Sequence, residues 1–88
     1  MDASTIVRRK EGVLSTKIDG EAVLMNVDSG NYFTLNTVGS VIWDLLESSI
    51  SVSQLQEELL ERFDGDRETI LSESKAYIHD LTTKGLIA

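Results

Sequence analysis

Apolar and polar positions alternate in the first third of the chain and predict two β-strands joined by a tight turn. Residues 13–19 alternate with a period of two, as do residues 21–27, which is typical of half-buried strands. The Asp19-Gly20 pair between them predicts a two-residue type I′ turn, because both central residues of that turn need positive φ. This loop fixes the register of the hairpin and places Ile18 opposite Glu21.

The same register predicts which face of the hairpin is buried. The expected core face consists of Leu14, Thr16, Ile18, Val23, Met25 and Val27. The opposite face would carry Val13, Ser15, Lys17, Ala22, Leu24 and Asn26. Because the first set is the more apolar, we expect it to pack against the rest of the protein.

A third strand is expected at Asn31–Leu35, after a turn-forming sequence. A three-residue loop, Asp28-Ser29-Gly30, would place Phe33 and Leu35 on the expected core face. A slip of one residue would turn both side chains over, so burial should select this loop. Gly30 would then occupy the left-handed position of a type I turn followed by a bulge.

Three helices are expected after the third strand, because apolar residues then recur at helical spacing. Asn36 or Thr37 is expected to cap the first helix, Ser51 with Gln54 the second, and Asp66 the third. The apolar stripes comprise Val38, Val41, Ile42 and Leu45, then Val52, Leu55, Leu59, Leu60 and Phe63, then Ile70, Ser74, Tyr77, Ile78 and Leu81. A three-stranded antiparallel sheet followed by three helices is an α+β fold.

The length predicts a single domain over residues 1–88, with a small core. Residues 1–11 have little pattern and are expected to form either a frayed arm or a short strand around Ile6–Arg8. Gly39 lies inside the first helix, where glycine is about 1 kcal/mol less favourable than alanine. A glycine at such a position usually marks the close approach of another backbone. Trp43 lies on the flank of its stripe, so we expect it to be partly buried.

Charge and composition exclude several classes of protein. The chain has a net charge of −7 and no cysteine, which excludes disulfides and thiolate chemistry. It has no apolar run of about 18 residues and no signal-peptide pattern at its start, so we expect no membrane association and a cytoplasmic location. Residues 44–73 carry nine acidic residues against two arginines, which would repel nucleic acid. The acidic surface either solvates the helices or steers a basic peptide.

No residue pattern predicts catalysis, a cofactor or a metal site. His79 is the sole histidine and is expected on the surface. Asp28-Ser29-Gly30 resembles the start of a metal-binding loop, but the spacing that an EF-hand requires fails after it. Glu57 and Glu61 lie one helical turn apart on a solvated face, whereas general acid–base catalysis favours a buried carboxyl group. We therefore expect a protein that is not an enzyme.

Residues 27–46, VDSGNYFTLNTVGSVIWDLL, resemble the signature of the PqqD-like family of leader-peptide recognition elements. The matching features are Tyr32-Phe33, Leu35-Asn36, Gly39, Ile42-Trp43 and Leu45-Leu46. The resemblance implies a winged-helix-like fold and non-catalytic binding of a precursor's leader, which is presented to a leader peptidase or other modifying enzyme. The chain is most similar to the stand-alone leader-binding proteins of lasso peptide biosynthesis. The alternatives are a pyrroloquinoline quinone-type precursor chaperone for a radical enzyme and an acidic winged-helix-like regulatory protein.

The resemblance also implies where the leader binds. The family holds the leader as an added strand against the third strand, in a groove shared with the third helix. This suits the sequence, because an edge strand offers unpaired N–H and C=O groups. The expected peptide-binding residues are Asn31, Tyr32, Phe33, Thr34 and Leu35 from the strand, with Leu71, Ser74, Lys75, Tyr77 and Ile78 from the third helix. Periodicity leaves open which flank of that helix faces the groove, and a monomer or a weak dimer through the edge is expected.

Overall fold

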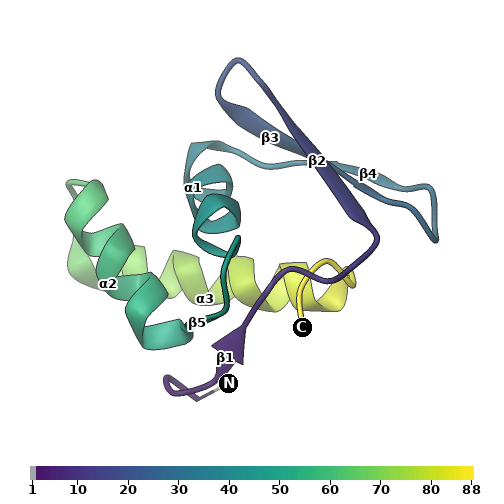
Figure 1. The fold of residues 1–88 in the computed structure, drawn as a ribbon. Coiled ribbons are helices and arrows are strands. Elements are labelled where there is room, and N and C mark those ends of the chain that lie inside the picture. Colours follow the sequence, from purple (N-terminus) through teal and green to yellow (C-terminus); the bar gives the residue numbers. More distant parts are fainter. Residues whose placement is uncertain (1) are drawn as a thin grey trace.

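The computed structural model describes residues 2–88, in which a small antiparallel sheet packs against three helices (Figure 1). The elements are β1 (Ile6–Val7), β2 (Val13–Ile18), β3 (Glu21–Asn26), β4 (Tyr32–Thr34), α1 (Thr37–Leu45), β5 (Ile50–Ser51), α2 (Val52–Arg62) and α3 (Arg67–Thr83). Strands β2, β3 and β4 form the main sheet in that order, and β1 pairs with β5 apart from it. The predicted α+β fold is confirmed. Each helix among residues 2–88 falls short of the length and apolar character needed to cross a bilayer.

The β2–β3 hairpin has the predicted turn and register. Ile18 lies opposite Glu21. The turn residues Asp19 and Gly20 have φ angles of 53° and 82°, as a type I′ turn requires. The Asp-Gly pair therefore predicted both the position of the turn and the register of the two strands correctly.

The prediction of the buried face of that hairpin is wrong. Ala22 and Leu24 face the helices and are 1% and 0% exposed, whereas Leu14 and Ile18 are 59% and 60% exposed. Alternation alone shows that two faces exist, but the placement of the helices decides which one is covered. The small side chain of Ala22 lets α1 pack closely against β3. Lys17, on the neighbouring strand, forms an ion pair of 2.5 Å with Asp44 of α1.

The β3–β4 loop is also longer than predicted. Met25 lies opposite Tyr32, and the Asn26 N–H donates to the Asn31 carbonyl at 3.0 Å, so four residues rather than three form the loop. Gly30 does have the predicted positive φ, at 73°. The loop is one residue longer than predicted, and the buried face of the hairpin is the opposite one. The two errors compensate each other, so Phe33 and Leu35 of the third strand still face the core, as predicted.

The predicted helix caps are confirmed. The Asn36 side chain accepts a hydrogen bond from the Gly39 N–H at 2.9 Å and caps α1. Ser51 and Gln54 form the expected capping box of α2, and Asp66 caps α3. These caps satisfy backbone donors that the first helical turn cannot pair.

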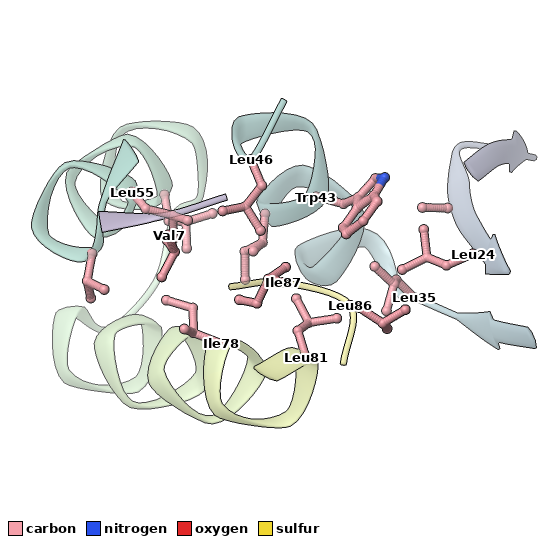
Figure 2. Close-up of a cluster of buried hydrophobic side chains, with 14 residues drawn as sticks. Val7, Leu24, Leu35, Trp43, Leu46, Leu55, Ile78, Leu81, Leu86 and Ile87 are labelled. Atoms are coloured by element: carbon pink, nitrogen blue, oxygen red, sulfur yellow. The ribbon is translucent and has the colours of Figure 1, made fainter. Parts of the chain in front are cut away.

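One core joins the sheet to the helices and to both ends of the described chain (Figure 2). Trp43 is 2% exposed, so the prediction of partial burial is wrong. The Arg9 guanidinium lies 4.4 Å from the centre of its ring and donates to the Trp43 carbonyl, which seals the indole from solvent. Val7 of β1 is buried, so the first residues contribute a short strand, the second of the two expected arrangements.

Candidate functional site

Strand β4 forms one edge of the main sheet, and its outer side has no strand partner among residues 2–88. The Asn31 carbonyl and the Leu35 N–H both bond to β3. Since bonded and non-bonded pairs alternate in an antiparallel ladder, the backbone groups of Tyr32 and Thr34 point away from β3. These two residues are the part of β4 that can pair with another extended chain.

A groove of about 370 Å³ separates this edge from α3. It is lined by Thr34, Leu35, Ala76, Tyr77, Asp80 and Lys84. Asp80 and Lys84 form an ion pair of 2.8 Å, and the Lys84 ammonium lies 5.2 Å from the ring centre of Phe33. The groove therefore has apolar walls with a pair of opposite charges at one side.

Gly39 of α1 lets Tyr77 of α3 reach this groove. A Cβ atom at Gly39 would lie 2.5 Å from Cε1 of Tyr77, which is far inside van der Waals contact. The sequence predicted that another backbone approaches this glycine, but a side chain does so instead. The missing Cβ sets the position of the tyrosine ring.

Ser40 of α1 attaches the helix to the end of β4. Its hydroxyl accepts a hydrogen bond from the Ala22 N–H at 2.7 Å and donates to the Leu35 carbonyl at 3.2 Å. The side chain is buried, so no water competes for these two bonds. One hydroxyl thus continues the β3–β4 ladder where the chain leaves the sheet for α1.

All five predicted strand residues lie on or beside the free edge. Leu35 is buried, Phe33 is half-buried, and Asn31, Tyr32 and Thr34 are exposed. Leu35 and Thr34 line the groove, and Phe33 lies beside it under the Lys84 ammonium. These five residues therefore lie together at the sheet edge, and their role in peptide binding stays a prediction.

The helical half needs correction, because only Tyr77 of the five predicted residues lines the groove. Ser74 and Ile78 are fully buried in the core. The Ser74 hydroxyl donates to the Leu71 carbonyl at 2.8 Å and accepts from Nε2 of Gln56 at 3.1 Å, so it satisfies an amide of α2 rather than leaving room for a ligand.

Leu71 and Lys75 are absent from the residues that line the groove, and Ala76, Asp80 and Lys84 were missed by the sequence reasoning. Lys75 precedes Tyr77 by two residues, about 200° around the helix. Residues three or seven positions after Tyr77 share its flank. Once Tyr77 is known to face the groove, this spacing predicts that Asp80 and Lys84 also face it.

The outer face of the sheet is largely apolar and uncovered. Leu14, Ile18, Val27 and Tyr32 are between 50% and 69% exposed. A shallow depression of about 260 Å³ lies over this face, and Tyr32 belongs to both the depression and the free edge. Leu14, Ile18 and Val27 were predicted for the core, whereas Tyr32 was predicted for the peptide-binding edge.

Groups that could hold a metal are not found within residues 2–88. His79 is exposed, as predicted. The features of the described chain are therefore an open strand edge, a groove beside it and an apolar sheet face.

These features define a class of small α+β domain, in which a three-stranded sheet presents a bare edge beside a helix. The chain belongs to the PqqD family, because the family model for coenzyme PQQ synthesis protein D matches residues 21–87. The predicted family resemblance is thereby confirmed. No curated protein matches the chain.

Two solved structures share this fold. One is described as TbiB1 in complex with the TbiA(beta) leader peptide, is 31% identical and has a TM-score of 0.83, covering 91% of this chain and 93% of that chain. The other is described as lasso peptide synthetase B1 complexed with the leader peptide, and has 21% identity and a TM-score of 0.80. It covers 93% of this chain and 96% of that chain, and at this identity it supports the fold alone.

Proposed function

We propose that this chain is a non-catalytic adaptor that binds the leader of a ribosomally made precursor peptide, as part of lasso peptide biosynthesis. The observation that carries the proposal is the free edge of β4, where Tyr32 and Thr34 offer backbone groups beside a groove. The 31% identical TbiB1, whose structure contains a leader peptide, supports it. The adaptor then presents the leader to a leader peptidase or another modifying enzyme.

In this proposal the leader joins the sheet as a further strand. Backbone pairing supplies affinity with little demand on sequence, and alternate side chains of the leader enter the groove. The contacting residues are Asn31, Tyr32, Phe33, Thr34 and Leu35 with Ala76, Tyr77, Asp80 and Lys84. The Asp80–Lys84 pair would favour leader side chains with a polar end, because an apolar group there would desolvate both charges.

Proline substitution tests the edge directly. Thr34→Pro removes an N–H that points away from β3, so the sheet should persist while the incoming strand loses a bond and meets the proline ring. Calorimetric titration with the leader of a precursor encoded beside this chain should show affinity reduced about tenfold or more. Ser15→Pro is the matched control, because the Ser15 N–H points to the opposite free edge, on β2.

Undiminished leader affinity in a folded Thr34→Pro protein would contradict strand addition at β4. Failure of the unmodified protein to bind the leader at tens of micromolar would contradict the adaptor function itself. Phe33→Pro provides a useful contrast, because it removes a ladder bond to β3 and should lower stability as well as affinity.

A second candidate follows from the family description, coenzyme PQQ synthesis protein D. In that case the bound chain would be a precursor of pyrroloquinoline quinone, and the edge of β4 would bind it in the same way. Competition between the two kinds of precursor for one labelled leader separates the candidates. Displacement by only the quinone precursor would favour the second.

A further inference from the structure

A second pocket lies beside the N-terminal half of α3. It has a volume of about 190 Å³. It is lined by the apolar residues Val38, Leu59, Phe63 and Ile70 and by Asp64, Gly65, Asp66, Thr69 and Glu73. The floor is therefore hydrophobic, and three carboxylates stand around it.

This pocket and the β4 groove lie on the same flank of α3. Glu73, Tyr77, Asp80 and Lys84 follow one another at intervals of three or four residues, so they form one row along the helix. Glu73 lines the second pocket, whereas the other three line the groove. Tyr77 packs against Gly39 of α1, and the residue before Gly39 in the sequence, Val38, lines the second pocket.

The spacing of the two pockets suits one extended peptide. Ile70 and Tyr77 are seven residues apart, which is about 10 Å along a helix. An extended chain covers that distance in about three residues. Phe33 lies near Lys84 and Leu35 shares the groove with Tyr77, so β4 runs toward the second pocket (Figure 1). A peptide on β4 that continues past Leu35 is therefore directed toward this pocket.

The lining specifies the chemistry of the occupant. Asp64, Asp66 and Glu73 belong to none of the ion pairs found within residues 2–88. They also do not belong to a metal-binding group in that part of the chain. Lysine and arginine combine an aliphatic stem, which suits the apolar floor, with a cationic end that suits the carboxylates.

We propose that this pocket binds a lysine or arginine side chain of the same leader peptide, three or four residues beyond the segment that pairs with β4. This inference rests on the proposed leader binding and adds a charge requirement to it. The acidic rim then selects among precursors, since a leader with an acidic residue at that position would place like charges together.

The test uses the shortest segment of the leader that still binds the full chain. Three extensions are compared, each a Gly-Ser-Gly spacer followed by lysine, glutamate or alanine, at the N-terminal end in one series and the C-terminal end in another. Two series are needed because the direction of the added strand decides which end passes Leu35. In one series, lysine should raise the affinity about three- to tenfold over glutamate.

Pocket variants locate the effect. Asp64→Asn with Glu73→Gln should abolish the preference for lysine, whereas Glu57→Gln with Glu61→Gln, which removes two charges from the exposed side of α2, should leave most of it. The amide signal of Gly65 should move on addition of the lysine peptide. An equal loss in both double variants, or no preference in either series, would overturn the pocket while leaving leader binding intact. Failure of the whole leader, from which the segment is taken, to bind would overturn both.

Discussion

Replacing Gly39 by alanine should have opposite effects on stability in the presence and absence of Tyr77. Alanine in a helix gains about 1 kcal/mol over glycine. In this protein, however, the new Cβ would lie 2.5 Å from Cε1, 2.8 Å from Cζ and 3.0 Å from Oη of the tyrosine. Overpacking of this kind costs about 1–3 kcal/mol, so Gly39→Ala should lower the unfolding free energy by up to about 2 kcal/mol.

Removing the ring should reverse the sign. In a Tyr77→Ala background the space at Gly39 is open, so Gly39→Ala should stabilise the protein by about 1 kcal/mol. The two substitutions should therefore show a coupling energy of about 1–3 kcal/mol. Urea unfolding of the four proteins, followed by the fluorescence of the buried Trp43, measures this coupling.

An equal effect of Gly39→Ala in both backgrounds would refute the reasoning, because it would mean that the ring does not occupy the space beside the glycine. Leader titration adds a second readout. Since Tyr77 lines the groove, the Gly39→Ala protein should bind the leader more weakly even if the ring yields and little stability is lost.

Three further substitutions test other contacts by urea unfolding. Ser40→Ala should cost about 1–3 kcal/mol, because it leaves a buried backbone N–H without its acceptor, whereas the exposed Ser72→Ala should change stability by less than about 0.5 kcal/mol. Ser74→Ala should cost about 1 kcal/mol, because it removes the nearer of the two acceptors of the Gln56 amide. It should leave leader affinity within about twofold, since the residue lies in the core away from the groove. A large loss of affinity would contradict that placement. Asn36→Ala should cost about 1 kcal/mol through loss of the cap of α1, and no change would mean that the cap is dispensable.

Local chemistry made the turns and helix ends predictable. An Asp-Gly pair, a capping box and an N-cap aspartate each act over four residues or fewer, and each was found where the sequence placed it. The buried face of the hairpin was not predictable in this way. It depends on the helices that follow, and the face with more apolar residues is the one that they leave uncovered.

The strand half of the candidate site was predictable because β4 is a single short strand at an edge. The helical half was not, since Ser74 and Tyr77 both belong to the apolar stripe of α3 although one fills the core and the other lines the groove. Periodicity identifies the centre of a stripe, but the neighbours on each side decide which flank is open. The packing of Tyr77 against Gly39 settles that point, and it requires the folded structure.

The uncovered sheet face has a consequence for how copies of this protein meet in solution. Leu14, Ile18 and Tyr32 favour contact between two copies, whereas a charge of −7 on each copy opposes it. Salt weakens the repulsion, whose range falls to about 10 Å at 0.1 M, but does not weaken the attraction between apolar faces. Ionic strength therefore sets the balance between repulsion and attraction in the free protein, and added salt favours self-association.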